Sequence, residues 1–272
     1  MTANLLEVSD LDVRYGGSEH YAVRHLEFTL APGEVLGVVG ESGSGKTTLG
    51  TALLGLLPEG ATASGSVRFD GVELLGASEK RLRPLRGTQL STIMQNAATA
   101  LNPCFTIGSQ MTDLLRRHRR LSRSAARAEA VGWLRKVGIP APETRLKSYP
   151  HQLSGGMNQR VVIAMALALS PKLVIADEPT SALDVTVQAA VLGLLRRLID
   201  ELDSAMVLIT HDLGVVAQLC SKVIVMNGGV VVEHGPVGQL MTKPRDAYTR
   251  RLLASLPARR GHEPHATVGG PG

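Results

Sequence analysis

Residues 36–47 read Leu36-Gly37-Val38-Val39-Gly40-Glu41-Ser42-Gly43-Ser44-Gly45-Lys46-Thr47. An apolar run with the pattern of a buried strand leads directly into a glycine-rich turn, and the residues after it, as far as Leu57, have the pattern of a helix. In such a unit the glycines let successive backbone N–H groups surround phosphate oxygens, and the helix N-terminus adds partial positive charge. The stretch therefore predicts a P-loop within an α/β fold that binds a nucleotide.

The side chains around this turn predict hydrolysis of the nucleotide as well as binding. Lys46 is expected to reach the β- and γ-phosphates, and Thr47 to offer its hydroxyl to Mg²⁺. The acidic pair Asp177-Glu178 follows the apolar run of residues 173–176, so Asp177 is expected to hold Mg²⁺ through water and Glu178 to act as general base. The residues expected to bind ATP and Mg²⁺ in this part of the site are Gly40, Glu41, Ser42, Gly43, Ser44, Gly45, Lys46, Thr47, Thr48 and Asp177.

Composition sets the broad class but selects no partner. The chain has 272 residues, with 44 % hydrophobic and 3 % aromatic residues, so one large α/β domain with an aliphatic core is expected. A net charge of +5 is compatible with nucleotide, nucleic acid or an anionic membrane surface. The N-terminus lacks a signal-peptide pattern, and the longest apolar run, residues 161–169, is shorter than the ~20 residues of a membrane span. We expect a soluble chain.

The cysteines indicate a reducing environment and no metal cage. Cys104 and Cys220 are far apart in the sequence, and no second pair accompanies them. We expect both to be buried, unligated thiols.

Hydrophobic periodicity divides the rest of the chain into short strands and longer helices. The region before residue 70 is rich in strand patterns, and Trp133 is expected in the core of a later helical region. The expected strands lie in residues 5–15, 26–39, 66–69, 173–176, 206–210, 223–226 and 230–233, and the expected helical stretches in 46–57, 107–137, 154–169 and 187–202. Residues 257–272 are expected to be a disordered tail.

A second glycine-rich turn, Leu153-Ser154-Gly155-Gly156, resembles the signature motif of ABC-type ATPases. Residues 94–103, which contain Gln95, are similar to the Q-loop of that family, and residues 181–184 to its D-loop. His211 resembles the switch histidine, and Tyr15 the aromatic residue that stacks on adenine. The resemblance extends from about residue 5 to residue 257.

The resemblance implies a fold and an ATP site to which two copies of the domain contribute residues. The expected fold is a P-loop NTPase (RecA-like) core with an N-terminal antiparallel β subdomain and a helical signature subdomain at about 96–165, all within a nucleotide-binding domain of residues 1–256. Gln95 and His211 would act with Glu178 as catalytic residues, and Gln95 would also contribute to the Mg²⁺ site. The signature and D-loop residues that would act on the ATP of a partner domain are Ser154, Gly155, Gly156 and Asp184.

Within the family, the chain is most similar to the ATPase subunits of peptide/nickel importers. Three stretches carry this narrower resemblance: residues 95–103, residues 148–152 and the C-terminal run Asp246-Ala247-Tyr248-Thr249-Arg250. The chain departs from the group where Asp246-Ala247 replaces His-Pro, where Asn96-Ala97 replaces Asp-Pro, and at Asn158 in the signature.

The resemblance implies an ATP-hydrolysing, energy-coupling subunit of an importer for peptides, nickel or a related small solute or metal chelate. Its implied partners are a second ATPase subunit, two membrane-spanning permease subunits and an extracytoplasmic solute-binding protein, with no nucleic acid. The chain would sit at the cytoplasmic face of the inner membrane, held there by the permease subunits. The transported solute, and whether the second ATPase is identical, stay open.

Three other functions fit the sequence less well. An ABC exporter subunit is disfavoured by the importer-type Q-loop and C-terminal run. A soluble ABC ATPase that acts on DNA or ribosomes usually carries a coiled-coil arm or two cassettes. This chain has one cassette, and its stretch between the P-loop and the signature is too short for a coiled-coil arm. A P-loop kinase or GTPase leaves the signature motif unexplained.

The basic residues 116–120 predict a solvated helix face, with contact to anionic lipid headgroups as the alternative.

Overall fold

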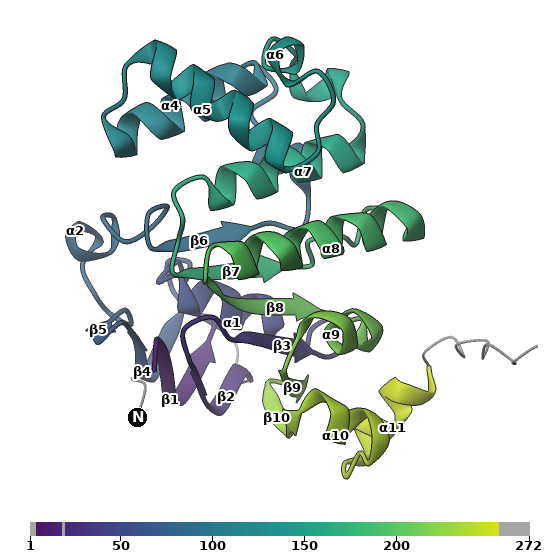
Figure 1. The fold of residues 1–272 in the computed structure, drawn as a ribbon. Coiled ribbons are helices and arrows are strands. Elements are labelled where there is room, and N and C mark those ends of the chain that lie inside the picture. Colours follow the sequence, from purple (N-terminus) through teal and green to yellow (C-terminus); the bar gives the residue numbers. More distant parts are fainter. Residues whose placement is uncertain (1–3, 18–19, 256–272) are drawn as a thin grey trace, which may run out of the picture.

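The computed structural model describes residues 4–17 and 20–255, which are built around a six-stranded sheet (Figure 1). Its strand order is β10-β9-β3-β8-β7-β6, parallel throughout except for the β9–β10 hairpin. The strands are β3 (Val35–Val39), β6 (Leu90–Ile93), β7 (Leu173–Asp177), β8 (Ala205–Thr210), β9 (Lys222–Asn227) and β10 (Val230–Pro236).

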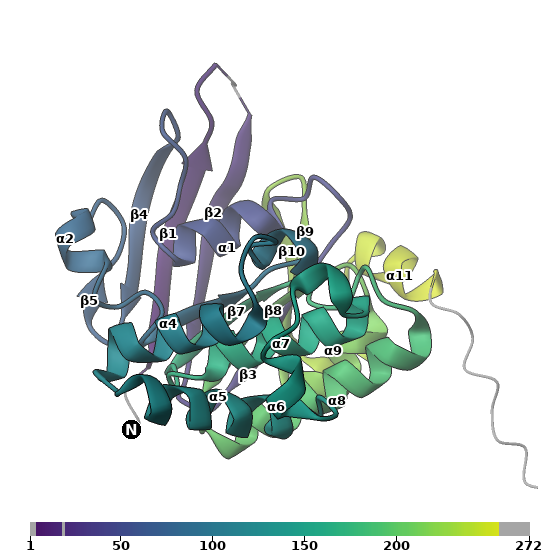
Figure 2. The same cartoon turned by 90° about the horizontal axis from the view of Figure 1, so that it is seen from above.

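A second, antiparallel sheet has the order β2-β1-β4-β5 and comes from the N-terminal part of the chain. In Figure 2 its long strands stand side by side, with α1 near them. Its strands are β1 (Leu6–Arg14), β2 (Tyr21–Leu30), β4 (Thr62–Phe69) and β5 (Val72–Glu73). Together the two sheets confirm the predicted α/β fold with an N-terminal antiparallel part.

Strand β7 shows why the central strands are apolar throughout. Val174 and Ala176 pack into a core shared with the helices, whereas Leu173 and Ile175 pack into a second core beneath the antiparallel sheet. Successive side chains of a strand point to opposite faces, so a strand covered on both faces needs an unbroken apolar run. The two cores therefore explain the unbroken apolar run from which a buried strand was predicted.

Helices cover the sheet, and those of residues 97–167 gather at its β6–β7 end (top of Figure 1). Trp133 is 8 % exposed in their core, as predicted. The helices are α1 (Lys46–Leu53), α2 (Glu79–Leu82), α3 (Ala97–Ala100), α4 (Ile107–Arg119), α5 (Arg123–Lys136), α6 (Pro142–Arg145), the 3-10 helix η1 (Pro150–Gln152), α7 (Gly155–Leu167), α8 (Val185–Glu201), α9 (Leu213–Leu219), α10 (Val237–Thr242) and α11 (Ala247–Ala254). The boundaries proposed for the helical subdomain stay a prediction.

Two predicted helices differ from those observed. The helical stretch 107–137 is two helices, because Arg120 takes a left-handed conformation and Ser122 caps α5 by accepting a hydrogen bond from the Ala125 N–H at 3.2 Å. Helix α1 ends at Leu53 rather than Leu57, and Gly55 just beyond it has a positive φ of 60°.

The prediction that both cysteines are buried is wrong for Cys104, which is exposed. Cys104 lies in the turn between α3 and α4, where its N–H donates to Asn102 Oδ1 at 2.9 Å. Burial was predicted from the apolar residue type alone, but in this turn the Cys104 side chain is not packed into a core. Cys220 is partly buried.

Two further expectations concern the ends of the chain and the membrane. The tail predicted for residues 257–272 lies outside the described residues. Among the residues that the structure describes, no helix is long and apolar enough to cross a membrane.

Candidate active site

A cavity of about 440 Å³ lies at the ends of three neighbouring parallel strands. The P-loop follows β3, Glu178 follows β7 and His211 follows β8. Because the carboxyl ends of parallel strands meet at one edge of a sheet, residues far apart in sequence converge there. The cavity is lined by Tyr15, Ala22, Ser42, Gly43, Gly45, Lys46, Thr47, Thr48, Gln95, Glu178 and His211.

Two P-loop glycines are required by close packing. A Cβ atom on Gly40 would collide with the Met226 carbonyl oxygen, and one on Gly45 with the Ala22 carbonyl oxygen. Gly45 also has a φ of 96°, which residues with a side chain rarely adopt. The loop is thus pressed against β2 and β9, and its shape depends on glycine.

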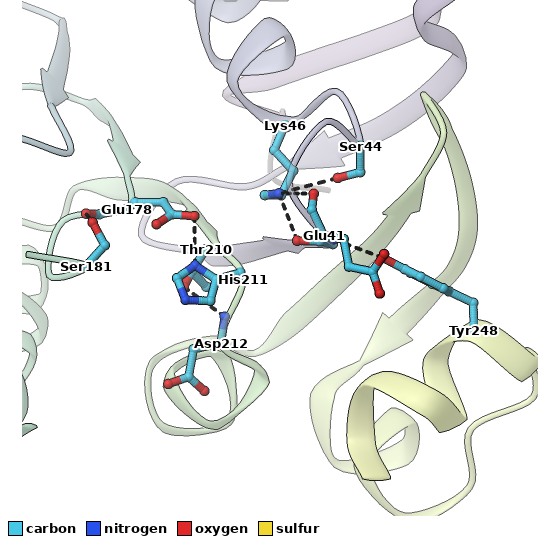
Figure 3. Close-up of polar contacts among 10 residues, drawn as sticks. Glu41, Ser44, Lys46, Glu178, Ser181, Thr210, His211, Asp212 and Tyr248 are labelled. Atoms are coloured by element: carbon cyan, nitrogen blue, oxygen red, sulfur yellow. Dashed lines mark hydrogen bonds and ion pairs between the residues drawn. The ribbon is translucent and has the colours of Figure 1, made fainter. Parts of the chain in front are cut away.

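Lys46 is folded back onto the loop that carries it (Figure 3). Its Nζ donates to the carbonyl oxygens of Gly40 and Glu41, both at 2.8 Å, and to Ser44 Oγ at 3.4 Å. Burial lowers the pKa of the Lys46 ammonium, and the charges of Glu178 and Asp177 oppose that shift. A buried cation that holds only carbonyl dipoles and a hydroxyl is well suited to move onto phosphate oxygens.

Thr47 and Asp177 offer ligands of the type that Mg²⁺ prefers. Burial raises the pKa of the Asp177 carboxyl and the charge of Glu178 adds to this, while a hydrogen bond from Thr47 and the charge of Lys46 oppose it. Hydroxyl and carboxylate oxygens are hard ligands for a small divalent cation. These residues therefore fit Mg²⁺ bound together with nucleotide phosphates.

Glu178 and His211 are in direct contact at the cavity wall (Figure 3). His211 Nδ1 lies 2.8 Å from Glu178 Oε1, and the Glu178 N–H donates to the Ile209 carbonyl at 2.8 Å. The Glu178 side chain is 17 % exposed and that of His211 is 61 % exposed. A carboxylate held this way at the cavity edge can accept a proton from a water molecule in the cavity.

Tyr15 and Gln95 complete the cavity from two other directions. The Tyr15 hydroxyl forms a 2.9 Å hydrogen bond with Thr48 Oγ1, which fixes the ring beside the start of α1. Gln95 comes two residues after the end of β6 and is exposed at the cavity.

The remaining predicted site residues are not among those that line this cavity. Asp177 ends β7, directly before Glu178, and the others form two groups. Gly40, Glu41 and Ser44 form the back of the P-loop, and the Glu41 N–H donates to the Tyr248 hydroxyl.

The second group is the signature and D-loop. Ser154 caps α7 by accepting from the Met157 N–H at 3.3 Å, and Asp184 caps α8 by accepting from the Val187 N–H at 3.0 Å. A Cβ atom on Gly156 would lie 2.7 Å from Val187 Cγ1, so the starts of α7 and α8 pack together. The structure thus brings the predicted trans-acting residues together on a surface of their own.

Two residues at or beside the site had no predicted role. Ala22 lines the cavity from β2, and a small residue in a strand carries no sequence signal for this. Tyr248 contacts the P-loop from α11, and its stretch was singled out only by the narrower family resemblance, which gave it no role at the site.

Comparison with known proteins identifies the family. The family profile described as "ABC transporter" matches residues 23–181, a range that contains the P-loop, Gln95, the signature and the acidic pair. The chain belongs to the ABC transporter family. ATP hydrolysis is the activity of this ABC ATPase, because the family profile matches it and a solved ATP-binding cassette shares its fold.

Relatives and solved structures agree with this assignment. The ABC ATPase is 48 % identical over 257 residues to the oligopeptide transport ATP-binding protein OppD of Bacillus subtilis, covering 93 % of this chain and 72 % of the relative. It is 46 % identical over 256 residues to the dipeptide transport ATP-binding protein DppD of Escherichia coli, covering 93 % and 78 %. A dimeric structure of the ATP-binding cassette MJ0796 bound to ADP and Pi aligns with a TM-score of 0.75 at 28 % identity, covering 85 % of this chain and 98 % of that one.

Proposed function

We propose that this ABC ATPase is the energy-coupling subunit of an importer for peptides, and that it works as a dimer with a second ATPase subunit. The observation that carries the proposal is the separation of the predicted ATP-binding residues onto two surfaces, one at the P-loop cavity and one at the starts of α7 and α8. The relatives named for oligopeptide and dipeptide transport support peptides as the solute class.

At the cavity, each residue has a distinct task toward ATP. Lys46 leaves the Gly40 and Glu41 carbonyl oxygens and pairs with the β- and γ-phosphates, while the glycine backbone surrounds them. Thr47, Asp177 and Gln95 would hold Mg²⁺, which neutralises phosphate charge when bound.

Hydrolysis then depends on the pair at the cavity edge. Glu178 takes a proton from the attacking water, and His211 orients the Glu178 carboxylate and contacts the γ-phosphate. Tyr15 stacks on the adenine ring.

The signature surface completes the site of the partner subunit. Ser154 would donate to the γ-phosphate held by the partner, Gly155 and Gly156 would let the backbone approach it, and Asp184 would couple the two sites. Val185, next to Asp184, is 82 % exposed although it is apolar, which supports a protein surface packing there. The MJ0796 cassette, described as dimeric with ADP and Pi, is a precedent for such an arrangement.

An apolar groove supports contact with permease subunits. It has a volume of about 280 Å³ and lies between the core and the helices that follow β6, with Leu56 and Met94 among its exposed lining residues. Met94 lines this groove and the adjacent Gln95 lines the nucleotide cavity. A protein seated in the groove would therefore act on a segment that touches the ATP site.

We place the chain at the cytoplasmic face of the membrane, where this groove contacts the permease. The complete importer contains two permease subunits and an extracytoplasmic solute-binding protein. The test is uptake by the source cell after the chromosomal copy is changed to Glu178→Gln. Uptake of a radiolabelled oligopeptide should be lost while uptake of ⁶³Ni²⁺ is unchanged. Normal peptide uptake would contradict the proposed solute, and a selective loss of nickel uptake would replace it with nickel or its chelate.

A further inference from the structure

The C-terminal helix α11 reaches back to the P-loop across 207 residues of sequence (Figure 3). The backbone N–H of Glu41 donates a 2.9 Å hydrogen bond to the hydroxyl of Tyr248. Tyr248 is 5 % exposed, so the acceptor side of this hydrogen bond is buried. Tyr248 belongs to the same buried apolar cluster as Val39, the last residue of the strand that enters the P-loop.

Tyr248 is held in place from its backbone as well as its ring. The Asp246 carboxylate caps α11 by accepting from the Tyr248 N–H at 2.7 Å. Glu233 of β10 in turn accepts from the backbone N–H groups of Arg245 and Asp246, at 2.9 and 3.1 Å. The Arg251 guanidinium lies 5.8 Å from the centre of the tyrosine ring. The hydroxyl therefore occupies a set position relative to the central sheet.

Glu41 is the point where this support meets the phosphate-binding machinery. Its N–H is held by Tyr248, and its carbonyl oxygen accepts from Lys46 Nζ at 2.8 Å and from the Ser44 N–H at 3.2 Å. When Lys46 turns to the phosphates of ATP, Glu41 loses the lysine contact. The hydroxyl of Tyr248 then becomes the restraint from outside the loop that keeps this peptide from turning.

We propose that Tyr248 is a positioning residue for ATP binding: it fixes the Glu41 backbone so that the P-loop stays open for phosphate while Lys46 changes partners. The inference rests on the nucleotide site described above. A purely structural role, in which the hydrogen bond only attaches α11, would alter stability and leave nucleotide affinity unchanged.

Tyr248→Phe separates these roles because it keeps the buried ring and removes only the hydroxyl. Binding of MgATP to the full chain is measured by calorimetry well below the unfolding temperature. The loss of one neutral hydrogen bond should raise Kd about 2- to 10-fold. Turnover at saturating ATP should stay within about twofold of the unchanged protein, because no group that touches the reacting atoms is altered.

The matched control is Tyr149→Phe, a tyrosine on a different segment whose ring stacks on His151. It should leave Kd unchanged. A second variant, Asp246→Ala, should raise Kd by itself but add little in the Tyr248→Phe background, because it acts through the same hydroxyl.

Three results would overturn the proposal. They are an unchanged Kd in a folded Tyr248→Phe protein, an equal change in the Tyr149→Phe control, and full additivity of Asp246→Ala with Tyr248→Phe. Failure of the unchanged protein to bind MgATP would instead overturn the nucleotide site itself, and this inference with it.

Discussion

His211 Nδ1 lies 2.8 Å from Glu178 Oε1, which links the residue after β8 to the residue after β7 across the edge of the central sheet. Glu178 adopts a left-handed backbone conformation with a φ of 45°, a strained position for a residue with a side chain. The contact orients the carboxylate at the edge of the cavity. This is the arrangement required of a base that must accept a proton from water.

Glu178→Gln should retain ATP binding and lose turnover by about 10²-fold or more, because an amide cannot accept the proton. Since ATP then persists, the variant should also accumulate as a dimer, measured by light scattering in the presence of MgATP. The control is Glu201→Gln on α8, an exposed glutamate that pairs with Lys136 and Arg197. It should turn over normally. Normal turnover in Glu178→Gln would exclude the general-base role.

Ser154→Arg should leave ATP binding by the isolated subunit intact and block hydrolysis in the assembled complex, because the bulky cation would occupy the surface offered to the partner's ATP. Ser122→Arg is the matched control, since Ser122 is likewise an exposed N-cap serine, on α5. Both variants lose a helix cap, worth about 0.5–2 kcal/mol. Only the Ser154 variant should lose hydrolysis. Loss of ATP binding by the isolated Ser154→Arg subunit would show that the signature acts in its own site.

Gly40→Ala should abolish nucleotide binding, because the added methyl group collides with the Met226 carbonyl oxygen and Ser44 Oγ and must displace the loop. Gly132→Ala in α5 is the control, since a Cβ there meets nothing within 4 Å. That change should stabilise the protein by about 0.5–1 kcal/mol through helix propensity. Both effects are read from thermal unfolding with and without MgATP. Binding by Gly40→Ala equal to that of the unchanged protein would contradict the packing argument.

The two cysteines should differ in reactivity toward iodoacetamide. Burial raises the pKa of the Cys220 thiol to about 12, although the charge of Arg196 opposes this, whereas Cys104 is exposed. The thiolate is the reactive form, and a raised pKa means that it appears only as the pH approaches that value. At pH 8 to 10, mass spectrometry should therefore detect alkylation of Cys104 alone until the protein is unfolded. Cys104→Ser should remove the fast reaction, and rapid labelling of Cys220 at pH 8 would contradict its burial.

The parts of the fold that depend on residues close in sequence were predictable. The strand–loop–helix unit around Lys46 and the strands at 223–226 and 230–233 are encoded in neighbouring residues, so they were predicted and are present. The end of α1 and the break at Arg120 were missed, because a helical pattern continues past both positions and single backbone torsions end the helices.

Strand β6 was not predicted from the sequence, for a different reason. Its four residues, Leu90–Ile93, carry too short a pattern to predict a strand, and pairing with β7 stabilises them there. This strand nevertheless decides where Gln95 lies, because Gln95 follows it two residues later at the same sheet edge as Glu178. The approach of Gln95 to the cavity was therefore implied only by the family resemblance.

By itself the sequence determined the P-loop, the acidic pair after an apolar strand and the order of the signature motifs, because each depends on residue types at short, regular spacing. Only the tertiary structure decided which surface each motif occupies, that Cys104 is exposed, and that Tyr248 supports Glu41 from 207 residues away. Contacts of that kind arise when the sheet brings distant segments together, and no local pattern of residues records which partner the packing will provide.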